Sequence, residues 1–119
     1  MSGLRRSVSI KNNYEFRRLY SKGRSSARPT LVVYSRRNKS GTNRVGFTVT
    51  VKLGHAVVRN RVRRRLREIY RLHEPELPRG VDIIVVARTR SVTASYRELE
   101  QDYLLALQKL ELISGSRSE

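Results

Sequence analysis

The side chains with the most evident capacity for chemistry are arginines, and they gather in one segment. Residues 57–71 read VVRNRVRRRLREIYR. If successive residues are placed about 100° apart, as in a helix, four apolar residues share one stripe that must face a core: Val58, Val62, Leu66 and Ile69. The opposite arc carries the other side chains, and we predict that it faces solvent: Arg59, Asn60, Arg61, Arg63, Arg64, Arg67 and Arg71.

Phosphate binding is the chemistry that this array favours. Arginines four residues apart repel each other by a few tenths of a kcal/mol per pair, and Glu68 is the only acid in the segment. A row of phosphates reverses that cost, because each guanidinium can bind a phosphate through two hydrogen bonds and release counterions. The alternative is a solvated face that only promotes solubility. Arg65 projects into the apolar stripe, so we expect its stem to be buried and its head to reach the helix edge.

The turn before this helix adds a second candidate for anion binding. Lys52, Gly54 and His55 lie where backbone N–H groups and the helix dipole favour negative charge. His55 and His73 have no carboxylate or second histidine at a supporting spacing. We therefore interpret both histidines as non-catalytic.

Three aromatic residues form a further candidate site. Phe16 and Tyr20 are four residues apart on a predicted helix, and Tyr34 lies on a strand that could run alongside. An aromatic stripe of this kind usually belongs to a core. Arg17, Arg18, Lys22 and Arg24 surround Tyr20, however, and aromatic rings among basic side chains also hold unpaired bases. Both interpretations remain open.

Charge points to a polyanionic partner for the whole chain. Its 119 residues suit one domain, with 26 Lys and Arg against 10 Asp and Glu, a net charge of +16. The first 71 residues hold 20 of the basic residues and only two acids, so we expect the later acids, including Glu98, Glu100 and Asp102, to face elsewhere. Arginine outnumbers lysine 21 to 5, which suits phosphate contacts but equally fits a coding bias toward arginine.

Other classes of protein are disfavoured. The chain has no cysteine, which excludes disulfides and thiolate metal sites, and it shows no carboxylate cluster for two-metal hydrolysis. We therefore predict no metal held by protein ligands. The longest apolar run, residues 83–87, is far shorter than the roughly 20 residues of a membrane span, and no signal-peptide core is present. We expect a cytoplasmic protein that does not bind membranes and needs no obligate protein partner.

Periodicity and capping predict the elements that position these residues. A short helix runs from Asn12 to Gly23, and residues 24–28 form a linker. Strands at 29–37 and 44–51 pair as an antiparallel hairpin through turn residues 38–43. The arginine helix spans residue 57 to about residue 72, and Val81–Ala87 forms a central strand buried on both faces. Ser95 and Glu98 form a capping box for a last helix that continues to about Ile113.

The resulting order is α-β-β-α-β-α, with room for one additional short strand. A single compact domain with a sheet packed against helices, an α/β sandwich of the α+β class, is the simplest solution. Residues 1–11 are expected to be a flexible basic arm, and residues 114–119 a frayed tail.

The segment KLGHAVVRNRVRRRLREIYR, residues 52–71, resembles the signature of the protein subunit of bacterial ribonuclease P, GxAVxRNRxKRxxRExxR. Arg63 stands where the family usually has lysine, and Val51 stands where a lysine often precedes the motif. Three other segments resemble the family's first helix, the strand into the motif and the late strand: YEFRRLYSKG, RVGFTVTVKLG and VDIIVVAR.

The resemblance implies both a fold and a division of labour. The fold would be a sandwich like one domain of a ribosomal protein, with a left-handed crossover. A large RNA would carry the catalytic centre and its Mg²⁺ ions, and the arginine helix would contact that RNA. A cleft would hold the single-stranded 5′ leader of precursor tRNA, which the RNA removes by endonucleolytic hydrolysis. The residues that map to this cleft are Phe16, Tyr20 and Tyr34, with Lys52 and His55 near its margin.

Charge and fold by themselves also suit other binding proteins. A non-enzymatic ribosomal or RNA-chaperone protein is the main alternative. A protein that recognises double-stranded DNA needs mixed polar side chains on its recognition helix. The solvent face of the helix predicted here is almost uniformly arginine. A helix that lies on a membrane surface is disfavoured because the apolar stripe lacks Trp and Phe.

Overall fold

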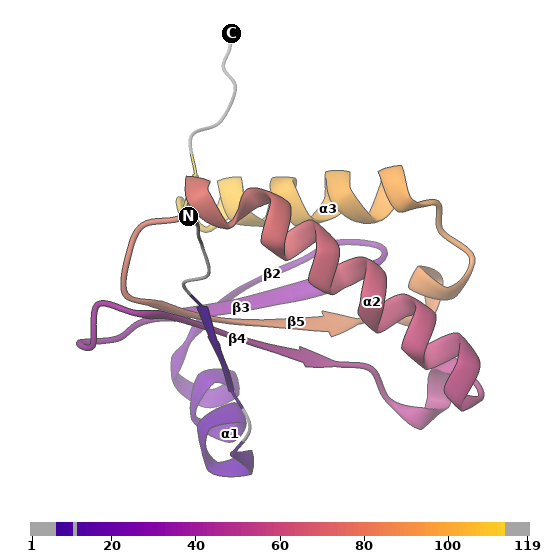
Figure 1. The fold of residues 1–119 in the computed structure, drawn as a ribbon, viewed down its shortest axis with the longest axis horizontal. Coiled ribbons are helices and arrows are strands. Elements are labelled where there is room, and N and C mark those ends of the chain that lie inside the picture. Colours follow the sequence, from indigo (N-terminus) through magenta and orange to yellow (C-terminus); the bar gives the residue numbers. More distant parts are fainter. Residues whose placement is uncertain (1–6, 11, 114–119) are drawn as a thin grey trace, which may run out of the picture.

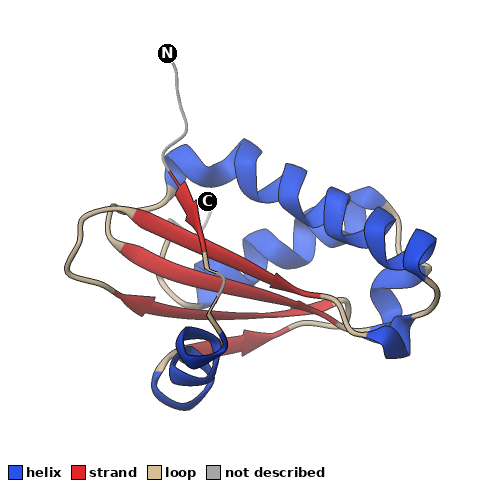
Figure 2. Ribbon diagram, turned by 60° about the horizontal axis from the view of Figure 1, so that its bottom comes forward, coloured by secondary structure: helices blue, strands red, loops and turns tan. Residues whose placement is uncertain are grey.

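The computed structural model describes residues 7–10 and 12–113, which form one five-stranded sheet with helices on both faces. Figure 1 shows α1 on one face of the sheet and α2 and α3 together on the other, and Figure 2 shows the same layers from a second direction. The strands are β1 (Ser7–Ser9), β2 (Arg24–Ala27), β3 (Leu31–Arg37), β4 (Asn43–Thr48) and β5 (Val81–Ala87). The helices are α1 (Asn13–Lys22), α2 (Ala56–His73) and α3 (Tyr96–Lys109). Short 3-10 turns cover Val51–Leu53, Glu74–Glu76 and Thr89–Val92.

All six predicted elements are present, and two strands join them. The predicted linker at residues 24–28 contains β2, which pairs antiparallel with β3 at one edge of the sheet. The predicted basic arm contains β1, which pairs in parallel with β4 at the other edge, and Ile10 after it is buried. The remaining arm residues, 1–6 and 11, and the tail at 114–119 lie outside the described residues. Both added strands are short and mostly polar, so their sequences lack the alternation of apolar and polar residues that predicts a strand.

The predicted hairpin of β3 and β4 is wrong. The strand order is β1-β4-β5-β3-β2, so β5 lies between them, antiparallel to β3 and parallel to β4. The turn residues bind the start of β5 instead of closing a hairpin: the Asn38 amide donates to the Gly80 carbonyl at 2.7 Å, and the Gly80 amide donates to Asn43 Oδ1 at 2.7 Å. A strand buried on both faces needs hydrogen-bond partners at both edges, and the central position supplies them.

The main core lies between the sheet and the pair α2 and α3. Val62, Leu66 and Ile69 of α2 are buried in it, as the apolar stripe predicts, whereas Val58, the fourth residue of that stripe, is only half-buried. The α3 helix begins with the predicted capping box, in which the Glu98 amide donates to Ser95 Oγ and Glu98 accepts from the Ser95 amide. It ends at Lys109, so Ile113 lies beyond the helix but still packs on the core.

α2 connects the parallel neighbours β4 and β5 and so forms the crossover of the fold. The left-handed sense of this crossover remains an expectation from the resemblance. Among the described residues, no helix is long and apolar enough to span a bilayer.

Candidate nucleic-acid interface

The arginine face is the surface of α2 that points away from the core. Arg61, Arg64 and Arg67 are exposed, as are Asn60 and Arg71, whereas Arg59 and Arg63 are half-buried. We use the name arginine face for these seven residues. The buried stripe holds the opposite side of α2 against the sheet, so the orientation of the arginine face is set by the core.

Few protein partners compete for these guanidinium groups. Arg59 Nε donates to the Gly54 carbonyl at 3.1 Å, and Arg63 Nη1 donates to Asn60 Oδ1 at 3.1 Å. No arginine of the face lies within salt-bridge distance of a carboxylate in residues 7–10 and 12–113. Most of the N–H donors of the face are therefore available to an anion from outside the chain.

Arg65 behaves as predicted. Its side chain is half-buried, and Nη1 donates to the Ala94 carbonyl at 3.2 Å, beside the start of α3. The stem thus covers part of the core while the charged head satisfies a backbone acceptor at the helix edge.

The turn before α2 is shaped by a glycine. Gly54 has φ of 143°, a conformation that residues with a Cβ rarely adopt, and a Cβ there would also meet Val58. Lys52 and His55 are exposed in this turn, and His55 precedes the first helical residue without capping it. Val51, predicted as the end of a strand, begins the 3-10 turn and is 73% exposed.

An aromatic cluster, Phe16, Tyr20 and Tyr34, lies on the other face of the sheet. The ring centroids of Phe16 and Tyr20 are 6.3 Å apart, and those of Tyr20 and Tyr34 are 4.9 Å apart in an edge-to-face arrangement. The Tyr20 hydroxyl is 2.9 Å from Thr48 Oγ1 on β4. The structure therefore brings together three residues that the sequence places on two separate elements.

The burial of the aromatic cluster fits both roles that the sequence leaves open, a place in the core and a surface for unpaired bases. Phe16 and Tyr34 are half-buried and pack against a small second core of Ile10, Leu19 and Ile84. Tyr20 remains 38% exposed. Phe16 lies against β4 only because Gly46 has no side chain, since a Cβ there would be 2.7 Å from Phe16 Cζ. The rings thus cap a core with one side and leave aromatic surface open with the other.

Lys52 and His55 follow Thr48 by four and seven residues, in the turn that leads into α2. The structure therefore associates them with the start of α2, with Thr48 as the link to the aromatic cluster.

An ion network that the sequence did not reveal holds α1 on the sheet. Arg44 of β4 donates to Asp82 Oδ1 at 2.9 Å through Nε and to Asp82 Oδ2 at 2.8 Å through Nη2, and its Nη1 donates to Glu15 of α1. These hydrogen bonds raise the pKa of Arg44. Burial tends to raise the pKa of Asp82, but hydrogen bonds from Arg44 and Asn38 outweigh it and hold that pKa below its usual range. The pairing joins residues 29 positions apart, so no local pattern signals it.

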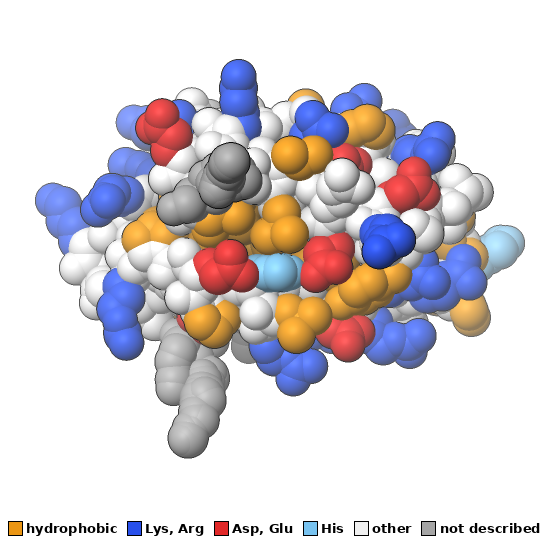
Figure 3. All heavy atoms as spheres, turned by 90° about the horizontal axis from the view of Figure 1, so that it is seen from above, with side chains coloured by type: hydrophobic (Ala, Val, Ile, Leu, Met, Phe, Trp, Pro, Cys, Tyr) orange, Lys and Arg blue, Asp and Glu red, His pale blue; other side chains and the backbone are white. Residues whose placement is uncertain are grey.

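His73 has carboxylate partners that the sequence interpretation denied. Nδ1 is 2.7 Å from Glu76 Oε2, and Nε2 is 2.7 Å from Glu100 Oε2. Burial tends to lower the pKa of His73, but the hydrogen bonds to the two glutamates prevail and raise it above its ordinary value. Figure 3 shows acidic side chains on both sides of a histidine on the face made by α2 and α3.

The acids of the last helix have structural partners. Glu98 caps α3 and Glu100 binds His73. Asp102 is buried, where it accepts hydrogen bonds from Arg28 at 3.2 Å and from the Thr30 hydroxyl at 2.6 Å. Each of these three carboxylates thus has a partner that is not part of the arginine face.

Comparisons with known proteins agree with this geometry. The family model for ribonuclease P matches residues 4–111. The ribonuclease P protein component of Alkaliphilus oremlandii is 44% identical over 107 residues, which are 90% of this chain and 94% of that protein. The RNase P protein of Staphylococcus aureus superposes with a TM-score of 0.81 at 34% identity, over 89% of this chain and 97% of that one. The RNase P protein of Thermotoga maritima, 24% identical, shares the fold with a TM-score of 0.73 over 92% and 98% of the two chains.

The match covers the arginine face, the aromatic cluster and the sheet between them, and it sets aside the ribosomal and chaperone alternatives. The chain belongs to the family of ribonuclease P protein components, the protein subunits of the ribonucleoprotein endoribonuclease that matures the 5′ end of tRNA.

Proposed function

We propose that the arginine face binds the catalytic RNA of ribonuclease P and that the aromatic cluster holds the single-stranded 5′ leader of precursor tRNA. The observation that carries this proposal is the pairing of two surfaces on one rigid sheet. One is a helix face whose arginines have no carboxylate partner among the described residues, and the other is an aromatic cluster with its central ring partly exposed. Guanidinium groups suit a folded RNA backbone, and aromatic faces suit unpaired bases.

The same proposal assigns hydrolysis to the RNA, with the magnesium ions that it binds. The chain's carboxylates support this assignment, because those of Glu15, Asp82 and Asp102 are engaged by arginines. The two glutamates at His73 are bound to different ring nitrogens and do not converge on one point. Within residues 7–10 and 12–113, no three histidine or acidic side chains are grouped to hold a metal ion. The protein supplies binding energy and needs no further protein subunit.

The decisive experiment measures the affinity of the reconstituted holoenzyme for precursor and for mature tRNA. Tyr20→Ala should lower precursor affinity by roughly 1 to 3 kcal/mol, the value of one base stacked on an aromatic ring, and leave mature tRNA unaffected. Tyr34→Ala should act in the same direction. Tyr20→Phe keeps the ring and removes only the hydroxyl that contacts Thr48, so its precursor affinity should stay close to that of the native protein.

Two controls separate stacking from folding. Tyr14→Ala removes a tyrosine of the same helix that is 60% exposed and lies outside the aromatic cluster, and it should change neither affinity. Melting curves of each variant report stability. If Tyr20→Ala lowers stability by about 3 kcal/mol while the ratio of precursor to mature affinity holds, the ring belongs to the core and the leader assignment is wrong.

A further inference from the structure

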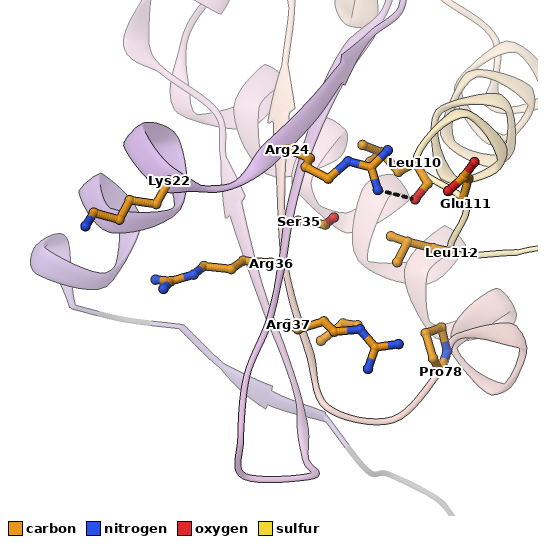
Figure 4. Close-up of a pocket in the computed structure, with 10 residues that line it drawn as sticks. Lys22, Arg24, Ser35, Arg36, Arg37, Pro78, Leu110, Glu111 and Leu112 are labelled. Atoms are coloured by element: carbon orange, nitrogen blue, oxygen red, sulfur yellow. Dashed lines mark hydrogen bonds between the residues drawn. The ribbon is translucent and has the colours of Figure 1, made fainter.

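A basic cavity lies at the C-terminal end of β3, past Ser35, where the pairing with β2 stops. β2 begins at Arg24, which is opposite Ser35, so Arg36 and Arg37 extend past the edge strand. An open cavity of about 470 Å³ wraps around this strand end. Figure 4 shows Lys22 and Arg36 on one side of β3 and Arg24 and Arg37 on the other. We call these four residues the edge site.

Most of the charge of the edge site is uncompensated. Lys22, Arg36 and Arg37 have no ion pair in residues 7–10 and 12–113, and Arg24 only donates to the Leu110 carbonyl at 3.4 Å. Glu111 is the one carboxylate that lines the cavity among the residues that the structure describes. Four cations against one anion, beside an apolar wall that includes Leu110, favour a polyanion as occupant.

Asp82 lies opposite Arg36 in the sheet and interacts electrostatically with it, but the hydrogen bonds of the Asp82 carboxylate go to other residues. Asp82 Oδ1 accepts from Arg44 and from Asn38, and Oδ2 accepts from Arg44. Among the described residues no hydrogen bond joins Arg36 to this carboxylate, so the N–H donors of Arg36 are available to an anion from outside.

The edge site continues the aromatic cluster along one face of the sheet. Positions along β5 give the order: Thr48 is opposite Val86, Tyr34 opposite Ile84, and Arg36 opposite Asp82. Each step is two residues, about 7 Å along the strand, and keeps the side chains on the same face. On α1, Lys22 follows Tyr20 by two residues. A single-stranded RNA that passes Thr48 and the three rings therefore reaches Arg36 and Lys22 next.

The order of these residues along the sheet also indicates the direction in which the leader would run. β4 leads from Thr48 toward the start of α2, whereas Arg36 and Arg37 lie at the opposite end of the sheet, where β5 begins. If the arginine face holds the catalytic RNA, the leader enters the aromatic cluster from the Thr48 end and leaves it at the edge site. Its upstream nucleotides then pass Lys22 and Arg36 on the face of the aromatic cluster, and Arg24 and Arg37 follow around the end of β3.

We infer that the edge site binds the sugar-phosphate backbone of leader nucleotides upstream of those stacked on the aromatic cluster, and so extends the recognised length of the leader. This inference rests on the proposed function and deepens it. Contacts of this kind are made to phosphates by arginine and lysine, so they carry no base preference.

A leader-length series with the reconstituted holoenzyme tests the inference. The probes are precursor tRNAs with a short leader of about three nucleotides, one for each ring, and a long leader of about ten. The native protein should bind the long leader more tightly than the short one. The Arg36→Ala, Arg37→Ala double variant should abolish that gain and reduce the salt slope for the long leader by about 1.4, or 0.7 for each lost phosphate contact. Binding of the short leader should be unchanged.

Matched variants make each outcome decisive. Replacing exposed Arg97 and Lys109 of α3 with alanine removes the same charge elsewhere and should preserve the gain from the long leader. The Arg36→Lys, Arg37→Lys double variant should preserve most of that gain. Equal weakening for both leader lengths places the contact on another RNA and overturns the inference, as does no weakening for either. Failure of the proposed function itself would appear differently, as a Tyr34→Ala variant that binds the short leader normally.

Discussion

At the residue scale, single side chains join elements that are remote in sequence. His73, in the last turn of α2, contacts Glu76 and also Glu100 of α3. Tyr20 similarly connects α1 to Thr48 of β4 and to Tyr34 of β3. His73 thus joins two helices to each other, and Tyr20 joins a helix to the sheet; the contribution of each to stability can be measured without RNA.

His73 should make stability fall as pH rises above about 6.5. Its folded-state pKa is raised above 6.5, so the folded protein holds a proton that the unfolded chain releases. The resulting stability is fully present below about pH 6.5 and is lost as pH rises through the folded-state pKa, at no more than about 1.4 kcal/mol per pH unit. Denaturant unfolding from about pH 6 to about pH 9 measures it.

The His73→Gln variant should flatten this dependence, because it removes the titrating group between the two glutamates. His55→Gln is the control, since His55 is exposed and forms no ion pair among the described residues. A profile that is the same for the native protein and His73→Gln would show that the ion pairs of His73 do not stabilise the fold.

At the element scale, α1 is held on the sheet by the Arg44 network as well as by apolar contacts. Arg44→Ala leaves Glu15 and Asp82 without their shared partner and should lower the free energy of unfolding by about 1–3 kcal/mol. That is below the 3–5 kcal/mol of a fully buried pair, because the side chains of Arg44 and Glu15 are each 28% exposed. Chemical denaturation measures the loss.

Arg90→Ala is the matched control for this substitution. It breaks the exposed ion pair between Arg90 and Glu98, which should contribute less than about 1 kcal/mol. If the two variants lose equal stability, the Arg44 network does not anchor α1.

The arginine face of α2 should act mainly through electrostatics. Arg63→Ala or Arg67→Ala should lower the salt slope of RNA binding by about one unit or slightly less and leave the melting temperature unchanged. Arg59→Ala is a less clean test, because Arg59 also binds the Gly54 carbonyl and supports the turn before α2. An unaltered slope for Arg63→Ala and Arg67→Ala would remove these residues from the interface.

At the scale of the whole molecule, the sheet separates two surfaces of different chemistry. The arginine face lies on the side of α2, and the aromatic cluster lies on the side of α1 (Figure 1). A protein with one contact surface on each side of its sheet can hold two RNA segments at a fixed separation. To position a substrate against a catalytic RNA in this way, the protein must be rigid but need not supply catalytic groups of its own.

The strand order predicts where that rigidity resides. β5 pairs on both edges and is buried on both faces, so its amides should exchange with solvent most slowly, near the rate of global unfolding. The edge strands β1 and β2 should exchange fastest among the strands. Hydrogen exchange resolved by residue measures this order, and protection of β5 no greater than that of β2 would contradict it.

The sequence by itself determined the features that depend on neighbours within one or two turns. The apolar stripe of α2 predicted its orientation, and Ser95 with Glu98 predicted the start of α3, because caps and helical periodicity act over three or four residues. The continuous apolar run at Val81–Ala87 predicted a central strand, because only a strand covered on both faces needs no polar alternation.

Tertiary structure alone decided which elements meet. The insertion of β5 between β3 and β4 depends on turn residues that bind Gly80, some 40 positions along the chain, and no local pattern encodes that choice. The pairs Glu15 with Arg44 and His73 with Glu100 span 29 and 27 residues. The edge site likewise exists only because β2 begins at Arg24, opposite Ser35, and leaves the last two residues of β3 without a partner on that edge. Local sequence sets which face each element buries, whereas partners across the sheet are selected by the packing of the whole chain.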